Sequence, residues 1–279
     1  MTVYALIPVF NRVELTRRVL DCLRAQRLDE ELKMVVIDDG STDGTREFLS
    51  TQRDVTVLNG DGTLWWGGAV ALGLHHVLSQ GNAEDWVLLL NNDTQFGSDF
   101  VHELLDAARA HAPAAVGSVI CDEANPERLI SIGVDVDTWR LRTRERLENP
   151  RPRDHALAPH AVDALSARGT LYPLAALRSA GNMNTTWLPH YLADYELAVR
   201  VKKAGYRLLV SERSVVFSNR VFGSAWRPSG VLDRFFAIRS PSYLPAVFAF
   251  WWRASTRLER LSLVPRLIYV NLRFRRPER

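Results

Sequence analysis

The stretch VVIDDGSTDGT, residues 35–45, carries the strongest indication of the fold. Its apolar run ends abruptly in two aspartates, and LLLNNDT, residues 88–94, repeats the same arrangement. A parallel strand that is buried on both faces reads as a continuous apolar run. Polar residues at its carboxyl end open into the crevice where α/β sheets bind ligands. The two runs therefore predict an α/β fold with acidic side chains along one edge of its sheet.

Strand and helix patterns alternate around these two stretches. We expect strands at residues 3–9, 33–38, 55–58, 86–90 and 114–119, and helices at 12–25, 43–51, 69–79 and 98–110. Short connections between them imply a mostly parallel sheet covered by helices on both faces. Asn11 is the expected N-cap of the first helix.

The alternation breaks after residue 120. Residues 130–136 and 164–173 are expected as strands, and residues 188–204 as a helix that ends at Gly205. The intervening segment 138–159 is rich in Arg, Glu and Pro, so we expect it to be an exposed loop.

Charge is distributed unevenly along the chain, which has 279 residues and a net charge of +3. Residues 231–279 contain ten Arg and three acids, together with the uncharged run YLPAVFAFWW. This run is too short to span a bilayer. We therefore expect a main domain at residues 1–230 and a basic, amphipathic helical tail at residues 231–279. The tail's apolar content favours a lipid surface over nucleic acid, and packing on the main domain or a homodimer contact is left open.

Four motifs in this order, PVFNR, IDDGSTDGT, NND and ADYELAVRVKKAGYR, make the chain resemble the family 2 glycosyltransferases. The resemblance covers roughly residues 1–220. It implies the GT-A fold, a nucleotide-binding sheet flanked by helices, and inverting transfer of a sugar from a nucleotide diphosphate. The last 60 residues carry no motif of the family.

The resemblance implies a pyrimidine nucleotide site at the start of the chain. Asp39 would accept a hydrogen bond from the imide N–H of uracil or thymine. Further nucleotide contacts would come from Pro8, Val9, Phe10, Asn11, Asp61, Gly62 and, at the ribose, Asn92. The alternative is that Asp38 and Asp39 cap a helix and form a turn with Gly40.

The resemblance also implies a metal ligand and a general base. Asp93 matches the acid that binds Mg²⁺ or Mn²⁺, and it is the only carboxylate of its motif. A histidine that the family places later in the chain is replaced here by Ser218 or Asn219. Asp194 matches the acid that deprotonates the acceptor hydroxyl, although the preceding acid of the family's pair is Ala193 here. The alternatives are an Asn-rich turn for Asp93 and a helix N-terminus for Asp194.

A donor or acceptor pocket is expected around four further side chains, Trp65, Trp66, His190 and Arg200. The tryptophans would form a wall of the pocket or stack on a sugar, or else pack in the core. Arg200 would face the phosphates or pair with an acid. Glu196, two residues after Asp194, points elsewhere on the helix and is not expected to act as the base.

The sequence thus predicts an inverting glycosyltransferase that uses a UDP- or dTDP-sugar. Its acceptor would be a hydroxyl of a glycan or a polyprenyl-linked glycan, in bacterial surface polysaccharide assembly at the inner face of the cytoplasmic membrane. Two alternatives remain: a sugar-1-phosphate nucleotidyltransferase and a non-catalytic protein that binds sugar nucleotides. The first would require a Gly-rich loop with a basic residue after the first strand, where this chain has Pro-Val-Phe-Asn.

Overall fold

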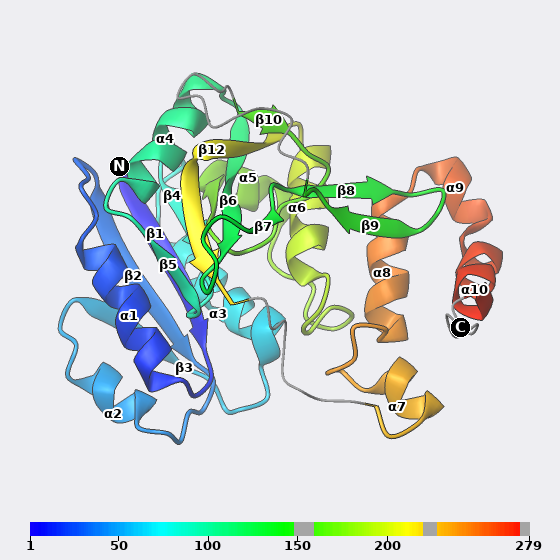
Figure 1. The fold of residues 1–279 in the computed structure, drawn as a ribbon, viewed down its shortest axis with the longest axis horizontal. Helices are drawn as coiled ribbons and strands as arrows, with labels where there is room; N and C mark the ends of the chain where they lie inside the picture. Colours follow the sequence, from blue (N-terminus) through cyan, green and yellow to red (C-terminus); the bar gives the residue numbers. More distant parts are fainter. Residues whose placement is uncertain (148–158, 220–227, 274–279) are drawn as a thin grey trace.

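The computed structural model of the protein describes residues 1–147, 159–219 and 228–273. Within these residues a ten-stranded sheet is covered by helices on both faces (Figure 1). Its main path runs in the order β10 (His160–Ala161), β12 (Arg207–Ser218), β6 (Ala114–Asp122), β11 (Thr170–Pro173), β4 (Trp86–Leu89), β1 (Thr2–Val9), β2 (Glu31–Asp38) and β3 (Val55–Asn59). Two short strands lie off this path: β5 (Thr94–Phe96) pairs with β12, and β7 (Leu129–Ser131) pairs with β6.

The first half of the sheet agrees with the sequence prediction. Strands β3, β2, β1 and β4 pair with one another in parallel, whereas β11 is antiparallel to β4. Alternate residues of β1 enter two different cores: Tyr4 and Leu6 face one cluster, while Val3 and Ala5 face the other. Burial on both faces explains why these strands read as continuous apolar runs. Helix α3 (Trp65–Gln80) packs on β1 and β2, and α2 (Thr45–Ser50) packs on β3. Helix α1 (Val13–Arg24) contributes to the core cluster of Val3 and Ala5, as does α4 (Phe100–Ala110), which packs mainly on β6 and β12.

The starts of helices α1 and α3 differ from the prediction in their caps. The N-cap of α1 is Arg12, with a left-handed φ of 68°, and not Asn11. The Asn11 side chain instead accepts a hydrogen bond from the backbone N–H of Thr42 at 2.9 Å. It thus links the segments that follow the neighbouring strands β1 and β2. Helix α3 begins at Trp65, four residues earlier than expected. Its N-terminus is capped by a residue that is distant in the sequence, as described below.

The region after β6 departs further from the prediction. The expected strand at residues 130–136 is interrupted at Gly133, which has a φ of 106°, and divides into β7 and β8 (Val134–Asp137). The expected loop at 138–159 contains the strand β9 (Arg142–Glu145), which pairs with β8 in a separate hairpin. Residues 148–158 of that expected loop lie outside the described part. Only β11 forms within the expected strand at 164–173.

Two helices follow β11: α5 (Leu174–Ala180) and α6 (Ala193–Lys203). Helix α6 begins five residues later than predicted, but it terminates at Gly205 as expected. Gly205 has a φ of 97°, and its N–H donates to the carbonyl of Lys202 at 3.1 Å. The N–H of Tyr206 donates to the carbonyl of Val201 at 3.3 Å, which completes the hydrogen-bond pattern of a Schellman motif.

The tail consists of α7 (Val231–Phe236), α8 (Leu244–Ala254), α9 (Arg257–Leu261) and α10 (Leu263–Arg273). Helix α8 packs against α6, and its residues Ala246, Phe250 and Trp251 are buried in the same core cluster as β1 and α3. The alternative that the tail packs on the main domain is therefore confirmed for α8. Among the described residues, no helix combines the length and the apolar character that crossing a membrane requires.

The turn of the β8–β9 hairpin touches the end of the tail (Figure 1). The Thr138 hydroxyl donates to Glu259 of α9 at 2.6 Å. Arg266 of α10 donates to the carbonyl of Trp139 at 3.1 Å, and its guanidinium lies 5.2 Å from the centre of the Trp139 ring. The hairpin is thus fixed to the tail at its turn.

Candidate active site

The carboxyl end of β2 carries two aspartates with different surroundings. Asp38 is fully buried, and its Oδ1 accepts a hydrogen bond from the backbone N–H of Ser41 at 2.9 Å. Its second oxygen lies 3.7 Å from the Nε of Arg46. Asp38 therefore shapes the turn at residues 38–41, as one of the two interpretations of this motif required.

Asp39 caps helix α3. Its Oδ1 accepts backbone N–H groups from Gly62 at 2.9 Å and Leu64 at 3.3 Å, and its Oδ2 accepts the N–H of Trp65 at 3.1 Å. A carboxylate at a helix N-terminus satisfies orphan N–H groups and interacts favourably with the helix dipole. The carboxylate oxygens of Asp39 still have lone pairs that could accept a hydrogen bond from a nucleotide base. Base recognition by Asp39 stays a prediction.

Glycines allow the loop at residues 60–62 to approach Asp39 closely. A Cβ on Gly60 would lie 2.5 Å from Asp39 Oδ1, and one on Gly40 would lie 3.1 Å from the backbone nitrogen of Gly62. Asp61 is exposed and folds back on its own loop, where its Oδ1 accepts the N–H of Thr63 at 2.9 Å and the Thr63 hydroxyl at 2.6 Å. The loop is therefore held beside the end of β2.

The end of β1 lies next to the same edge. The carbonyl of Val9 accepts the N–H of Asp39 at 2.9 Å, and the N–H of Asn11 donates to the Ser41 hydroxyl at 2.7 Å. Phe10 projects into solvent with 54% of its surface exposed. The structure thus brings residues 8–11 together with Asp39, Asp61 and Gly62, which are the residues predicted to contact the nucleotide.

The end of β4 places Asn92 and Asp93 in contrasting positions. Asn92 is buried, and its amide donates to the Thr16 hydroxyl of α1 at 3.3 Å. Asp93 has one oxygen, Oδ1, that is buried with no hydrogen-bond partner, while its Oδ2 lies 3.8 Å from Nη1 of Arg12. A buried carboxylate oxygen without a partner is costly, so this atom suits a cation or a donor from a ligand.

Ser218, one of the two residues predicted to replace the family's histidine, lies beside this metal-ligand candidate. Ser218, at the end of β12, pairs with Thr94, the residue that follows Asp93. The Ser218 hydroxyl is buried and makes no hydrogen bond within the described residues. The chain therefore offers a small hydroxyl at this place instead of an imidazole.

The two tryptophans at the start of α3 have different environments. Trp65, with a φ of 55°, has its ring centre 5.8 Å from that of His190 and 5.3 Å from the Arg239 guanidinium. Trp66 packs against the main core, and its indole N–H donates to Asn91 at 3.0 Å. Burial, with a further contribution from Arg239, lowers the pKa of His190, so its imidazole stays neutral near pH 7.

A cavity of about 480 Å³ lies between the start of α3, the loop before α6 and the tail. Its lining combines aromatic, aliphatic and hydroxyl side chains: Thr63, Leu64, Trp65, Gly68, Ala71, Thr185, Thr186, Pro189, Ile238 and Tyr243. Trp65 thus faces a cavity, whereas Trp66 does not line it.

Asp194 stands in the first turn of α6, partly buried. Its Oδ2 accepts the N–H of Ala167 at 3.2 Å, and its Oδ1 accepts the N–H of Tyr195 at 2.9 Å. Burial raises the pKa of Asp194 to about 6; the negative charge of Glu145 adds to this rise, and the two backbone hydrogen bonds and Arg168 oppose it. Such a carboxylate is ionised at neutral pH yet retains more proton affinity than an ordinary aspartate, which suits a general base.

Glu196 and Arg200 form a structural pair. Glu196 is only 1% exposed, and the Nε of Arg200 lies 2.9 Å from each of its carboxylate oxygens. Arg200 also donates through Nη1 to the carbonyl of Gly181 at 2.9 Å. Of the two alternatives for Arg200, pairing with an acid is the arrangement in the structure, and Arg200 does not line the cavity.

Two residues near Asp194, Tyr195 and Glu145, were not predicted from the sequence to belong to the site. The Tyr195 hydroxyl donates to Glu145 of β9, which comes from the segment expected to be a loop. A usable signal was present in the complementary charges of VDVD and RTRE, because Asp135 faces Arg144 and Asp137 faces Arg142 across the hairpin.

Comparisons with known proteins agree with this arrangement. The family model for glycosyl transferase family 2 matches residues 4–161. The galactofuranosyltransferase GlfT1 of Mycolicibacterium smegmatis is 30% identical over 129 residues, which is 46% of this chain and 42% of that protein. An uncharacterized protein of Mycobacterium tuberculosis is 25% identical over 212 residues, 75% of this chain and 71% of its own length.

Solved glycosyltransferases share the fold. GalNAc-T7, crystallised with UDP, GalNAc and Mn²⁺, superposes with a TM-score of 0.64 at 15% identity, over 82% of this chain and 46% of that chain. The mannosyltransferase PcManGT from Pyrobaculum calidifontis, in complex with GDP-Man and Mn²⁺, gives 0.55 at 19% identity, over 97% and 74%. The matches cover less than half the length of GlfT1 and of GalNAc-T7. The family model spans more than half of this chain, and the chain therefore belongs to glycosyl transferase family 2, with the GT-A fold of a glycosyltransferase.

Proposed function

We propose that this glycosyltransferase moves one sugar, with inversion, from a UDP- or dTDP-sugar to a hydroxyl of a glycan or lipid-linked acceptor. The observation that carries the proposal is Asp194, a partly buried carboxylate at a helix start with a pKa of about 6. A nucleotide-sugar donor is supported by structural neighbours that hold UDP, UDP-GlcNAc or GDP-Man. Because one of these is a purine nucleotide, the pyrimidine preference rests on Asp39 alone.

In this mechanism Asp194 accepts the proton of the acceptor hydroxyl as its oxygen attacks the anomeric carbon. The new glycosidic bond forms on the face opposite the leaving group, and the bond from the anomeric carbon to the diphosphate oxygen breaks. The nucleoside diphosphate leaves with the bonding electron pair. A single in-line displacement of this kind inverts the anomeric configuration.

Asp93 fits a divalent cation, Mg²⁺ or Mn²⁺. Its buried Oδ1 has no hydrogen-bond partner, and oxygen ligands suit these hard cations. Among the described residues there is no group of three or more His, Cys, Asp or Glu side chains that could hold a metal, so donor phosphates and waters would complete the coordination. A bound cation would neutralise charge on the leaving diphosphate. Arg12 is a second positive charge beside Asp93.

A donor panel tests the proposed function. We would incubate the protein with Mn²⁺ and UDP-, dTDP- and GDP-sugars and measure release of the nucleoside diphosphate, with Asp194→Asn as the control. Family membership favours sugar transfer over the nucleotidyltransferase alternative and over a non-catalytic binding protein. Pyrophosphate release from a nucleoside triphosphate, or binding of donors without any turnover, would contradict the proposal.

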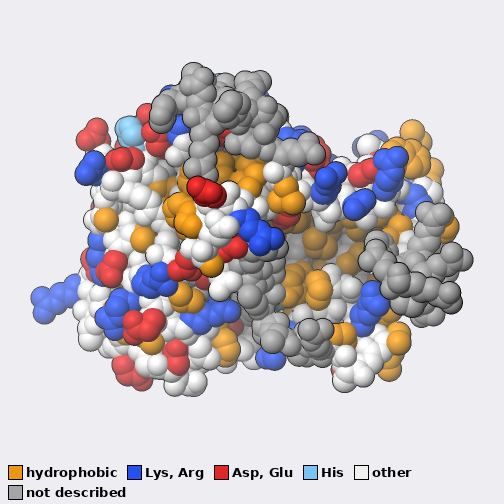
Figure 2. All heavy atoms as spheres, viewed as in Figure 1, with side chains coloured by type: hydrophobic (Ala, Val, Ile, Leu, Met, Phe, Trp, Pro, Cys, Tyr) orange, Lys and Arg blue, Asp and Glu red, His pale blue; other side chains and the backbone are white. Residues whose placement is uncertain are grey.

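The end of the tail is the proposed contact with a membrane surface. Leu258 and Leu261 of α9 are 79% and 84% exposed, and Val264 and Ile268 of α10 are also exposed. Figure 2 shows basic and hydrophobic side chains mixed over the C-terminal helices at the right of the view. Exposed apolar side chains among arginines suit a surface of anionic lipid. This contact would place the enzyme at the inner face of the cytoplasmic membrane, beside a polyprenyl-linked acceptor.

Replacing both Leu258 and Leu261 by Ser is expected to weaken binding to anionic vesicles, because it removes apolar area from an exposed surface without touching the core. Co-sedimentation with phosphatidylglycerol vesicles at low and high salt measures the effect, and salt should weaken wild-type binding. Leu232→Ser, at a 75% exposed leucine on α7, is the matched control. Point variants are preferable to truncation at residue 230, because α8 belongs to the core. Equal vesicle binding by all variants would contradict the proposed contact.

A further inference from the structure

Glu145 is held in a fixed position next to the proposed base. Its Oε1 accepts a hydrogen bond from the Tyr195 hydroxyl, and its Oε2 accepts one from the Ser131 hydroxyl. The Ser131 hydroxyl is buried and also accepts the backbone N–H of Gly133 at 3.1 Å. Both oxygens of the Glu145 carboxylate are therefore oriented by hydroxyl donors, and one of these donors belongs to the residue that follows Asp194.

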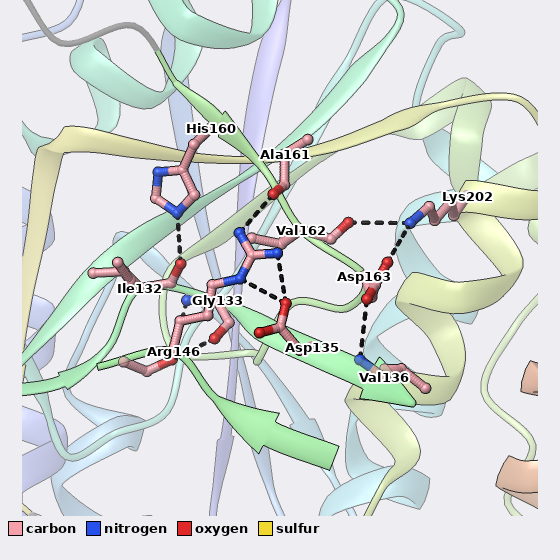
Figure 3. Close-up of polar contacts among 11 residues, drawn as sticks. Ile132, Gly133, Asp135, Val136, Arg146, His160, Ala161, Val162, Asp163 and Lys202 are labelled. Atoms are coloured by element: carbon pink, nitrogen blue, oxygen red, sulfur yellow. Dashed lines mark hydrogen bonds and ion pairs between the residues drawn. The ribbon is translucent and has the colours of Figure 1, made fainter. Parts of the chain in front are cut away.

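The strand that carries Glu145 is clamped on its other face (Figure 3). Successive residues of a strand point in opposite directions, so Arg146 faces away from Glu145. The Nε of Arg146 donates to Asp135 at 2.6 Å, and its Nη1 donates to the carbonyl of Ala161 at 2.8 Å. Its backbone N–H and C=O pair with the carbonyl of Gly133 and the N–H of Ile132. These bonds fix the register of β9, and with it the position of Glu145.

Residues 160–167, which bind the Arg146 side chain, also contact Asp194. The backbone of Ala164 exchanges two hydrogen bonds with Val134 of β8, and three residues later the N–H of Ala167 donates to Asp194. Lys202 of α6 donates to the carbonyl of Val162 and to Asp163, which in turn accepts the N–H of Val136 (Figure 3). The hairpin, residues 160–167 and α6 are thus connected through hydrogen bonds on both sides of Asp194.

We propose that Glu145 is a positioning residue for Asp194: it holds the first turn of α6 through the Tyr195 hydroxyl and places a second negative charge near the Asp194 carboxylate. This inference rests on the proposed role of Asp194 as base. The other ionisable groups near Asp194 are Arg168, whose positive charge opposes that of Glu145, and the tyrosines 172 and 195. Burial raises the pKa of both tyrosines, so they remain neutral, and Glu145 and Arg168 are the charged neighbours that act on Asp194.

The charge of Glu145 has a direct consequence for the base. A nearby like charge disfavours the ionised form of a carboxyl group. Together with burial, Glu145 therefore gives Asp194 a stronger affinity for the acceptor proton than an ordinary aspartate has. Substituting Glu145 by Gln keeps an oxygen acceptor for Tyr195 but removes this charge.

The test is a titration of Asp194 that requires neither donor nor acceptor. Aspartate-selective ¹³C labelling would report each carboxyl, and the Asp194 signal would be assigned by its absence in Asp194→Asn. In Glu145→Gln we expect the Asp194 signal to titrate at a pH lower by roughly 0.5 to 1. Glu103→Gln, which changes a partly exposed acid of α4 paired with Arg213, is the matched control and should leave the titration unchanged.

Tyr195→Phe distinguishes the hydrogen bond of Glu145 from its charge. The variant removes the hydrogen bond between residue 195 and Glu145, while Glu145 keeps its negative charge. Hydrogen exchange in the first turn of α6 should become faster in this variant. An Asp194 titration in Glu145→Gln that is identical to wild type, or unchanged exchange in Tyr195→Phe, would overturn the proposal. If the titration shifts as expected but the donor panel shows no turnover, the proposed function fails and the positioning role of Glu145 stands.

Discussion

Asp194→Asn is expected to lower the rate of sugar transfer by roughly 10²–10⁴-fold, the usual contribution of a positioned general base. The amide preserves the shape of the side chain, but it cannot take the proton of the attacking hydroxyl. Its NH2 group also replaces one of the two oxygens that accept the N–H groups of Ala167 and Tyr195. Donor affinity should be nearly unchanged, because the base acts in the transition state. Steady-state kinetics combined with calorimetry of UDP binding separates the two effects.

Glu196→Gln is the comparison that identifies the base. Glu196 is buried and paired with Arg200, so its substitution should lower the melting temperature while most of the transfer activity remains. In the wild type, the transfer rate should rise with pH through about 6, as Asp194 loses its proton. An inactive Glu196→Gln protein together with a fully active Asp194→Asn protein would assign the base to Glu196.

Asp194→Asn is also expected to stabilise the protein at neutral pH. An ordinary aspartate has a pKa of about 3.9, and the pKa of Asp194 in the folded state is raised to about 6, so its ionisation costs stability as pH rises from about 4 through 6. The neutral amide avoids this loss, which amounts to about 1–3 kcal/mol in the unfolding free energy. Thermal denaturation should show a higher melting temperature for the variant at pH 8 and no difference at pH 4. Equal melting temperatures at pH 8 would contradict the raised pKa.

Asp93→Ala is expected to abolish the metal dependence of nucleotide binding. The variant removes the carboxylate proposed to hold the cation, so UDP affinity in Mn²⁺ should fall by roughly 10–100-fold or more. It also frees Arg12, which lies 3.8 Å from Asp93, to interact with phosphate, so UDP affinity without metal should be kept or increased. Calorimetry with UDP, with and without Mn²⁺, measures both effects.

The pattern of the two titrations is more informative than either affinity alone. Asp99→Ala, a change at an exposed aspartate beside Arg27, should keep the metal dependence of the wild type. If Asp93→Ala still binds UDP more tightly in Mn²⁺ than without it, by the same factor as wild type, Asp93 is not the metal ligand.

The parallel half of the sheet was predictable because its strands are buried on both faces. The apolar runs that end at Asp38 and Leu90 need no information beyond their own residues. The motif residues around Asp39 and Asp93 follow the ends of such strands, so their approximate positions could also be predicted. Asp194 was placed at the start of a helix by the motif that surrounds it.

The start of α3 could not be predicted from the sequence, because the side chain that caps it comes from a distant part of the chain. Asp39 precedes Trp65 by 26 residues, yet its carboxylate satisfies the N–H groups that begin the helix. Local capping rules search the few residues before a helix and cannot find such a partner. Gly60 allows the loop before α3 to approach the Asp39 carboxylate closely, which is a contact between segments distant in the sequence.

The β8–β9 hairpin was hidden for another reason. Its second strand, RTRE, has no apolar alternation. It is held by the ion pair of the following residue, Arg146, with Asp135 and by contacts of Glu145 with distant elements. Glu145 was therefore assigned to a loop, and its proximity to Tyr195 became visible only in three dimensions.

The contacts at the two ends of this hairpin limit which segments could be exchanged between this enzyme and another family member. Its turn is bound to Glu259 and Arg266 of the tail, and its far end is bound to Tyr195 beside Asp194. The tail and the catalytic body therefore do not form interchangeable modules. A chimera that takes its tail from another family member would need to take residues 134–146 with it, or the strand that carries Glu145 would lose its outer anchor.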